Sequence, residues 1–400
     1  MTEQTKIEWA DSTFNPWTGC TQISPACDHC YAKAWSNRAG SNVGKWGPGA
    51  PRVRTSAAYW KQPAKWNRET WEECTDCGWR GPKHATHNFC PACDGEDMKP
   101  TRRRVFCASL ADWLDNEVPI EWLVDLLDLI RLTPNLDWLL LTKRIGNWRS
   151  RILSAISAYA GISQELATWL GEWLDGNPPA NVWIGATFCN QAEADRDIPK
   201  LLAVPARVRF LSIEPMLGPI DMARWLPAGK TVRRAGTGEP MWVAHFYMAR
   251  CEACGWTGSS ELLNYVSHGD DGQCYCPDCN QECDTETFGL DWIICGGESG
   301  PHARPMHPNW ARTLRDQCQT AGVPFLFKQW GEWCPMGGEA GLKYAGPPLE
   351  PNRVHWVWPD GSHEQIGCGR VGTLTSRVGK KAAGRFLDGV EHNGFPQVRP

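Results

Sequence analysis

The chain has 400 residues, a formal net charge of −4 and a pI of about 6.2. This balance excludes a globally basic nucleic-acid-binding protein, so a nucleic-acid partner would need a local basic patch. Apolar runs are too short to span a membrane and the N-terminus has no signal-peptide pattern, so we expect a cytoplasmic protein. The 19 cysteines then favour metal sites over disulfides.

The first cysteine group consists of Cys20, Cys27 and Cys30, spaced C-x6-C-x2-C. Three thiolates leave one iron of a cubane 4Fe–4S cluster without a protein ligand, and that open iron can bind a substrate or cofactor. The alternative is a zinc site with His29 as fourth ligand. Because His29 adjoins Cys30, joint tetrahedral ligation is awkward, and the spacing favours the iron–sulfur cluster.

Two further cysteine groups form an internal repeat, in which C-x2-C-G-W-x-G is followed by C-P-x-C. Four thiolates in two C-x2-C pairs predict a closed, structural zinc ribbon in each copy. Cys274 and Cys283 flank the second copy, and we prefer the C-x2-C pair beside them as ligands. The predicted zinc ligands are Cys74, Cys77, Cys90 and Cys93, and then Cys251, Cys254, Cys276 and Cys279.

Short continuous apolar runs alternate with helical patterns along the rest of the chain. The runs predict strands at 105–112, 138–144, 182–187, 208–215, 292–300 and 325–330. Helices are predicted at 120–131, 163–174, 191–202 and 310–321, and most of the 24 tryptophans are expected in the core. This alternation predicts an α/β fold with a parallel sheet, a partial TIM-type (β/α) barrel with two inserted zinc-ribbon modules.

The ribbons interrupt the barrel pattern as insertions. The expected segments are 1–39 (cluster-binding loop and start of the barrel), 40–102 (first ribbon), 103–227 (barrel), 228–285 (second ribbon) and 286–400 (end of the barrel and tail). Basic residues cluster at Arg102–Arg104, 230–234 and 377–385. Each cluster is either a nucleic-acid surface or a solvated loop.

Polar side chains follow the predicted strands at their carboxyl ends. Because chemistry in such barrels gathers at this edge, we expect a shared polar site there. Its candidate members are Asp112, Lys143, Arg144, Glu214, Glu298, Lys328 and Gln329.

A glycine pair follows the predicted strand that begins at Trp292. The segment runs Gly296, Gly297, Glu298, Ser299 and lacks the spacing of a dinucleotide-binding loop. The glycines either form a tight turn or let a ligand approach the backbone closely, and Glu298 can accept hydrogen bonds from an ammonium group.

The three-cysteine loop, the barrel pattern and the Gly-Gly-Glu segment together resemble the radical SAM superfamily. More closely, the chain resembles a phage and prophage family of radical-SAM-like proteins. The usual first gap between cluster cysteines is three residues and here it is six, and Gly-Gly-Glu usually follows the second strand and here comes near the end. The matching segments are 7–20, 27–32, 140–144, 211–215, 296–300 with 303–305, 328–331 and 380–389.

This resemblance implies that Cys20, Cys27 and Cys30 ligate a 4Fe–4S cluster. It implies that S-adenosylmethionine (SAM) chelates the free iron, and that Gly296–Ser299 take part in holding its methionyl group. An electron from a reductant such as flavodoxin or ferredoxin would cleave SAM to methionine and a 5′-deoxyadenosyl radical, which abstracts hydrogen from an unactivated carbon.

The resemblance further implies an isomerase that rearranges a glycine-derived modification on thymidine in phage DNA, within the host cytoplasm. Lys143, Glu214 and Lys328, with Arg144, would hold the charged substrate. A duplex base would have to be flipped out to reach the site. The alternatives are a radical SAM enzyme on a small metabolite or protein, and a non-enzymatic zinc protein that binds nucleic acid or another partner.

Overall fold

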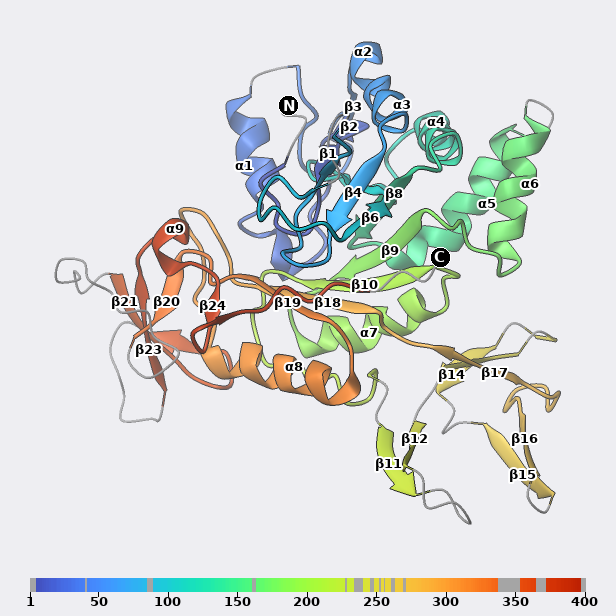
Figure 1. The fold of residues 1–400 in the computed structure, drawn as a ribbon. Coiled ribbons are helices and arrows are strands. Elements are labelled where there is room, and N and C mark those ends of the chain that lie inside the picture. Colours follow the sequence, from blue (N-terminus) through green and yellow to red (C-terminus); the bar gives the residue numbers. More distant parts are fainter. Residues whose placement is uncertain are drawn as a thin grey trace. The chain divides into compact units, whose positions relative to one another are not determined.

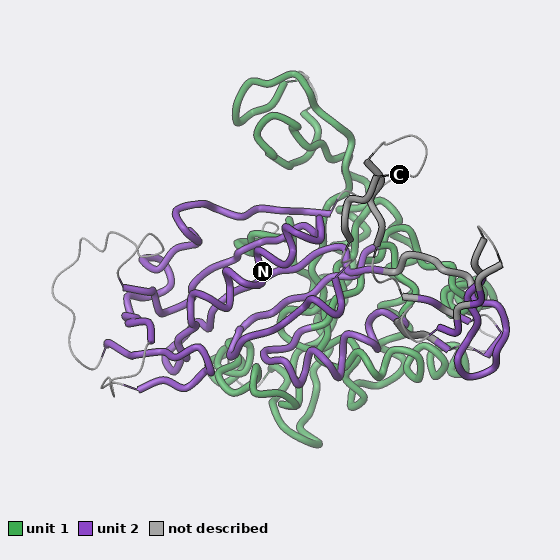
Figure 2. Tube along the Cα trace, turned by 90° about the horizontal axis from the view of Figure 1, so that it is seen from below, with its two compact units in different colours: residues 1–186, 204–207 green, residues 187–203, 208–400 purple. Residues whose placement is uncertain are grey.

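A computed structural model describes most of the chain, in two compact units. Unit 1 comprises residues 1–186 and 204–207, and unit 2 comprises 187–203 and 208–400 (Figure 2). The described residues are 5–39, 42–84, 89–159, 163–226, 229–233, 240–244, 248–251, 253–254, 256–259, 263–268, 271–336, 353–364 and 372–396.

The core of unit 1 is built on parallel strands whose residues are buried on both faces. These are β1 (Ser12–Phe14), β7 (Arg103–Cys107), β8 (Leu136–Thr142) and β9 (Val182–Thr187). Each strand pairs in parallel with the next in that order. The continuous apolar runs therefore form the buried parallel strands β7, β8 and β9 that the sequence predicted, whereas β1 was not predicted.

Helices α4 (Ile120–Arg131), α5 (Trp148–Tyr159) and α6 (Gln164–Leu174) pack on one another in unit 1. Ser163 caps α6 by accepting a hydrogen bond from the Leu166 amide at 3.3 Å, which explains why this helix begins where predicted. The shorter elements are β2 (Trp17–Thr18), η1 (Pro25–Cys27), α1 (Tyr31–Arg38), β3 (Val53–Arg54), α2 (Ala57–Trp60), α3 (Gln62–Trp66) and η2 (Ile145–Asn147).

Unit 2 contains the parallel strands β10 (Val208–Ile213), β18 (Trp292–Gly296) and β19 (Phe325–Gln329). Helices α7 (Gln191–Leu202) and α8 (Pro308–Ala321) run along one side of these strands, and α8 contacts β18 and β19 (Figure 1). Helix α8 ends at Gly322, whose φ of 68° is the left-handed conformation of a helix C-cap.

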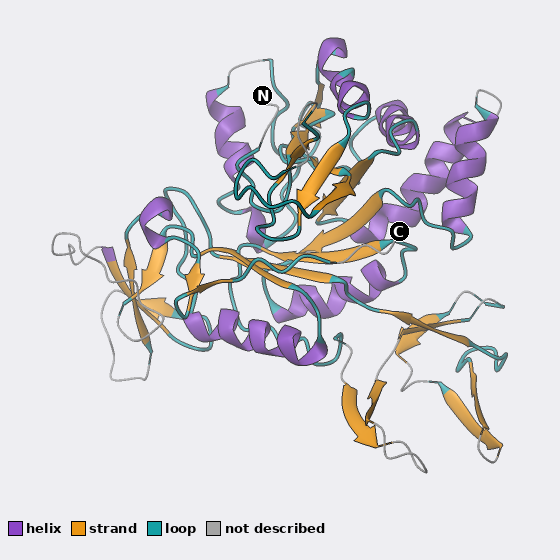
Figure 3. Ribbon diagram, in the orientation of Figure 1, coloured by secondary structure: helices purple, strands orange, loops and turns teal. Residues whose placement is uncertain are grey.

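The strand order of the main sheet is β1-β7-β8-β9-β10-β18-β19. Among the described residues, helices lie between successive strands of this sheet along the chain except between β10 and β18, where the second ribbon and its hairpins are inserted. Figure 3 distinguishes the helices from the strands. The fold is therefore mixed α/β with a parallel seven-stranded sheet, and to this extent the predicted partial barrel is confirmed. In the part of the chain that the structure describes, no helix combines the length and apolar character needed to cross a membrane.

The two predicted ribbons are three-stranded antiparallel sheets with the same strand order. The first consists of β4 (Trp71–Cys74), β5 (Arg80–Pro82) and β6 (Met98–Thr101), ordered β5-β4-β6. The second consists of β13 (Met248–Arg250), β14 (Thr257–Ser259) and β17 (Asp284–Phe288), ordered β14-β13-β17. The internal sequence repeat is thus a structural repeat.

Other antiparallel elements were not predicted from the sequence. Two hairpins accompany the second ribbon, β11 (Gly229–Arg233) with β12 (Pro240–Ala244) and β15 (Asn264–His268) with β16 (Asp271–Tyr275). The C-terminal part holds β20 (Trp333–Pro335), β21 (Val354–Val357), β22 (His363–Glu364), β23 (Thr373–Arg377), α9 (Lys380–Ala383), β24 (Phe386–Leu387) and β25 (Val390–Glu391).

Candidate functional site

The first ribbon brings the sulfurs of Cys74, Cys77, Cys90 and Cys93 together, all within 4.8 Å of one another. The Cys74 and Cys93 sulfurs lie 3.6 Å apart, as do those of Cys77 and Cys90. Tetrahedral zinc with Zn–S bonds of about 2.3 Å needs sulfurs about 3.8 Å apart. This group can therefore hold a single metal ion of that size.

The second ribbon repeats this arrangement with Cys251, Cys254, Cys276 and Cys279. The Cys251–Cys279 and Cys254–Cys276 sulfur pairs are each 3.5 Å apart. The backbone N–H of Cys254 lowers the pKa of Cys251 to about 6.

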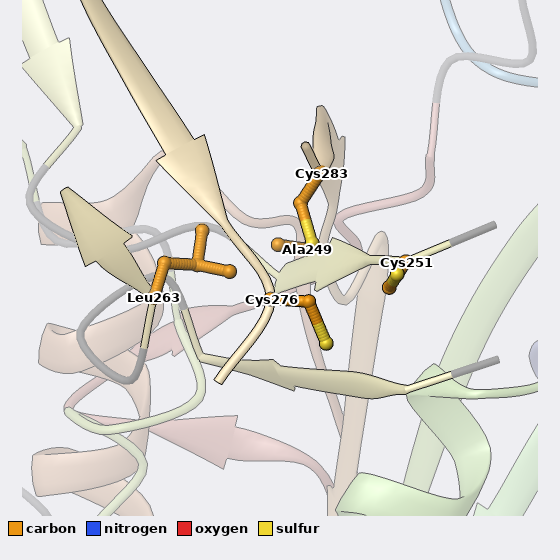
Figure 4. Packing of buried hydrophobic residues seen from close by; sticks show 5 residues of the cluster. All are labelled: Ala249, Cys251, Leu263, Cys276 and Cys283. Carbon is orange, nitrogen blue, oxygen red and sulfur yellow. The ribbon is translucent and has the colours of Figure 1, made fainter. Parts of the chain in front are cut away.

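The flanking cysteines of the second ribbon lie outside the four-sulfur group. Cys283 is buried in a small cluster with Ala249, Cys251, Leu263 and Cys276, and Cys274 packs against that cluster (Figure 4). The choice of the C-x2-C pair as ligands agrees with this geometry.

The metal-binding turns depend on left-handed residues directly after the second cysteine of each pair. Gly78, Asp94 and Asn280 occupy these positions with φ of 73°, 59° and 55°. Each amide donates to the carbonyl of the first cysteine of its own pair at 2.9 Å. Glycine, Asp and Asn are the residues that adopt this conformation most readily. The fourth position, Gly255, lies outside the described residues.

The three-cysteine loop lies in unit 1, and all three of its thiols are partly exposed. Cys20 follows β2, and its backbone forms an isolated parallel β-bridge with that of Trp46. Cys27 ends η1, and Cys30 is the N-cap residue of α1. Three thiols on one loop supply the donor chemistry that a 4Fe–4S cluster requires.

The zinc alternative requires a compact tetrahedral group around His29. In each ribbon the four donor atoms lie within 4.8 Å of one another. Among the described residues, the donor atoms of His29 and the three loop cysteines, Cys20, Cys27 and Cys30, do not form such a group. A cubane holds its cysteines on different iron atoms, so it does not demand such close donors.

Arg144 and Asp112 fix the backbone and sulfur at the start of this loop. The Arg144 guanidinium donates to Cys20 Sγ at 3.4 Å, to Asp112 Oδ2 at 3.2 Å and to the Thr21 carbonyl at 2.6 Å. Asp112 also accepts from Thr142 Oγ1 at 2.6 Å and from the Lys143 amide at 2.9 Å. The predicted strand-end residues Asp112 and Arg144 therefore meet beside Cys20, and Lys143 joins them through its backbone amide.

Burial determines the charge states of this cluster of side chains. It raises the pKa of the Cys20 thiol to about 12, an effect that Asp112 increases and Arg144 opposes. Burial also opposes the charged form of Arg144, but Asp112, Cys20 and Asp115 together outweigh it, and the net pKa of Arg144 is raised. Arg144 is therefore a permanent cation next to the sulfur, and a bound cationic metal centre would offset the burial penalty of a thiolate there.

A second buried network, which sequence reasoning missed, supports Thr21. Arg52 donates to Thr21 Oγ1 at 2.7 Å and to Asp115 at 2.9 Å, and it lies 3.0 Å from the Glu117 carboxylate. Arg52 falls in a segment assigned to the ribbon insertion, and no local pattern links it to the cysteine loop.

A separate polar network lies at the strand ends of unit 2. Lys328 donates to Glu214 Oε2 at 2.7 Å, and Gln329 donates to Glu214 Oε1 at 2.8 Å. Gln329 Nε2 also lies 3.1 Å from Ser299 Oγ. Four of the predicted site residues therefore meet here, although sequence reasoning gave no reason for Gln329 to join Glu214 to Ser299.

The glycine pair packs against the chain's own groups. A Cβ on Gly297 would lie 2.0 Å from the Trp330 carbonyl oxygen, and one on Gly331, with φ of 81°, would lie 2.0 Å from the Glu298 carbonyl oxygen. A Cβ on Gly296 would lie 3.2 Å from Glu214 Oε1. At Gly297 the absence of a side chain therefore lets the backbone of a neighbouring loop, at Trp330, come close.

The buried Glu298 forms an ion pair with Arg304, whose side chain is partly exposed. Its carboxylate accepts from the Arg304 amide at 2.7 Å, from Nε at 2.8 Å and from Nη2 at 2.7 Å. In this conformation the Arg304 guanidinium is bound to the Glu298 carboxylate, the group that the resemblance assigns to binding the amino group of SAM. Arg304 lies in the matching segment 303–305, which was the available sequence signal.

We expect the variants E298Q and R304Q to lose similar amounts of stability, about 3 kcal/mol, and the double variant to lose little more. Each substitution breaks the same ion pair, so their effects should not add. Urea denaturation measures this, and calorimetric titration with SAM gives a second readout. A SAM affinity lowered in E298Q but normal in R304Q would instead show that Glu298 contacts SAM directly.

Two of the arginines in the first basic cluster are buried. Arg103 lies over the rings of Trp66 and Trp71 at 4.7 and 4.8 Å, and Arg104 is only 8% exposed. The interpretation of these two residues as a nucleic-acid surface is therefore wrong. The aromatic rings that bury them come from distant positions that the triplet itself does not reveal.

The other basic clusters differ from the first. In the tail, Lys380 and Lys381 are exposed on α9. The Arg377 guanidinium donates to the Gly300 carbonyl at 2.9 Å. The side chains of the cluster at 230–234 lie outside the described residues.

One protein-family model matches nearly the whole chain. Residues 4–396 match the model of a family described as "Protein of unknown function (DUF5131)". No curated protein and no solved structure matches the chain. Because the match covers nearly the whole sequence, the chain belongs to the DUF5131 family.

Proposed function

We propose that this protein is a radical SAM-type enzyme in which Cys20, Cys27 and Cys30 hold a 4Fe–4S cluster with one open iron. The observation that carries the proposal is the contrast between cysteine groups. Eight cysteines form two closed four-sulfur groups, whereas these three partly exposed thiols share one loop without a fourth cysteine. The cluster with SAM would supply one-electron cleavage and hydrogen abstraction.

The two four-sulfur groups are proposed to bind Zn²⁺ as structural sites. Their sulfur spacings of 3.5–3.6 Å suit a tetrahedral ion with no position left for substrate. Zinc there would stabilise the ribbons and take no part in the chemistry.

Unit 1 and unit 2 would contribute different functions. In unit 1, Arg144 and Asp112 hold the cysteine loop, and Lys143 adjoins them. In unit 2, Glu214 and Lys328 form an ion pair whose members can exchange partners with a zwitterionic substrate. An amino-acid group carries both charges, which supports a substrate bearing a glycine-derived modification.

The substrate that we propose is a thymidine carrying that modification in phage DNA, and the reaction is an isomerisation. The exposed Lys380 and Lys381 and the two ribbons support a nucleic-acid partner. Arg103 and Arg104 are buried and give this partner no support. A small metabolite or a protein is the rival substrate.

The test uses the full chain, reconstituted anaerobically with iron and sulfide and supplied with SAM and a reductant. We expect 5′-deoxyadenosine release that increases with DNA bearing glycine-modified thymidine, and we expect no increase with unmodified DNA. Binding to DNA should weaken as salt rises, because phosphate contacts release counterions.

Three other outcomes would change the assignment. Turnover with the free modified nucleoside but not with DNA would move the substrate to the nucleotide level. SAM cleavage with no salt-dependent DNA binding would favour a metabolite or protein substrate. A colourless protein that holds zinc and no iron would favour the non-enzymatic zinc protein.

A further inference from the structure

Arg144 is fixed with one nitrogen directed at the sulfur of Cys20. Nη1 lies 3.4 Å from Cys20 Sγ, and its other contacts are to Asp112 at 3.2 Å and, through Nη2, to the Thr21 carbonyl at 2.6 Å. The side chains of Arg144 and Asp112 are only 6% and 7% exposed. The guanidinium is therefore anchored on both sides of the bond to sulfur, and water does not screen it well.

The anchors are themselves part of the fold. Asp112 accepts hydrogen bonds from Thr142 Oγ1 and from the Leu114 and Lys143 amides at 2.6–3.0 Å. Thr21 accepts a hydrogen bond from Arg52, which is paired with Asp115. Movement of Arg144 away from Cys20 would break bonds on the loop and at the end of β8, so the position of the donor is determined before any metal binds.

A charged donor at a ligand sulfur has a defined electrostatic effect. When a cluster accepts an electron its negative charge increases, and a cationic hydrogen-bond donor at one of its sulfurs stabilises the reduced form more than the oxidised form. Hydrogen bonds to the sulfurs are among the factors that set the reduction potential of such clusters.

We infer that Arg144 is a positioning residue that raises the reduction potential of the cluster by donating a hydrogen bond to the Cys20 sulfur. Asp112 and Thr21 hold it in place. This inference rests on the proposed function, since it requires that Cys20 is a cluster ligand. It gives a role to a strand-end residue that the resemblance implied only for substrate binding.

The first test compares R144Q and R144K with the unchanged protein, each reconstituted anaerobically. R144Q should load the cluster and shift its reduction equilibrium about tenfold against the reduced form, which is about 59 mV for one electron. R144K should shift it less, because it keeps the charge and loses the planar fork. The measurement is a redox titration followed by electron paramagnetic resonance, with iron and sulfide content determined in parallel.

A matched control is R131Q. Arg131 is also in unit 1, where it pairs with Asp128 at 2.9 Å and Glu165 at 3.1 Å, and none of its polar contacts among the described residues is to the cysteine loop. R131Q should leave the potential unchanged. A loaded R144Q protein with an unchanged potential would overturn the inference.

The second test uses the unchanged protein and R144K, so a folding defect in R144Q does not affect it. The protein is labelled with guanidinium-¹⁵N arginine, and the reduced cluster is examined by pulsed electron paramagnetic resonance. We expect a ¹⁵N hyperfine coupling from one arginine that is absent in R144K. No coupling in the unchanged protein would overturn the inference.

The two tests separate this inference from the proposed function. A protein that binds no iron–sulfur cluster contradicts both. A loaded cluster without the arginine coupling, or without a shift in R144Q, contradicts only the role of Arg144.

Discussion

Serine in place of Cys20, Cys27 and Cys30 should remove the iron and sulfide of the reconstituted protein while both zinc ions remain. A serine hydroxyl does not ionise near neutral pH and is a poor ligand for iron in such clusters, which are held by thiolates. SAM cleavage should fall to background. Metal analysis and 5′-deoxyadenosine release measure the two effects.

This substitution should have little effect on the fold. The three cysteines are partly exposed, so the change to serine leaves no large cavity and should cost about 1 kcal/mol or less per site. The circular dichroism spectrum and the urea midpoint serve as the control. A variant that keeps its iron, or loses zinc together with iron, would contradict the assignment of separate centres.

Loss of the metal from the first ribbon should strongly destabilise unit 1. Loss of the metal from the second ribbon should have a much smaller effect on the rest of the chain. The first ribbon is continuous with the core of unit 1. Trp71 in β4 lies under Arg103 of β7, and Arg80 in β5 pairs with Asp11 next to β1 at 3.3 Å. The second ribbon has a small core of its own around Cys251 and Cys276 (Figure 4).

The matched pair of variants is C74S/C77S and C251S/C254S, which remove corresponding ligands. Structural zinc sites supply about 10–16 kcal/mol of apparent binding energy, so loss of one removes folding energy from whatever the ribbon supports. We expect C74S/C77S to increase hydrogen exchange in β1 and β7 as well as in the ribbon, with a loss of several kcal/mol. For C251S/C254S, the increase should remain within 248–288.

Hydrogen exchange followed by mass spectrometry resolves these regions, and calorimetry gives the unfolding transitions. Equal protection of the β1 and β7 amides from hydrogen exchange in the two variants would contradict the view that the first ribbon stabilises unit 1. Zinc content measured in each variant confirms that one site has been lost.

Local patterns were sufficient to predict much of this fold. The C-x2-C pairs predicted both four-sulfur groups, because a metal-binding turn is determined by residues close together in the chain. Continuous apolar runs predicted the parallel strands, and the helix Ile120–Arg131 has the predicted bounds. Such features depend on few long-range contacts.

Features that depend on distant partners could not be predicted. Arg144 lies 124 residues from Cys20, and nothing in either segment reveals their contact. The buried Arg103 reads as a surface charge until Trp66 and Trp71 are placed beside it. In the sequence Glu298 has no evident partner. Arg304 is only six residues away, but their pairing depends on how the loop turns.

The packing of Gly297 and Gly331 has a consequence for how the Gly-Gly-Glu segment should be understood. Each glycine faces a carbonyl oxygen of the other loop at a distance that no side chain would tolerate. Carbonyl oxygens are present whatever the residue type, so no compensating substitution elsewhere can make room. The two positions are therefore constrained by backbone geometry alone, and glycine there would be required even in a protein that never binds SAM.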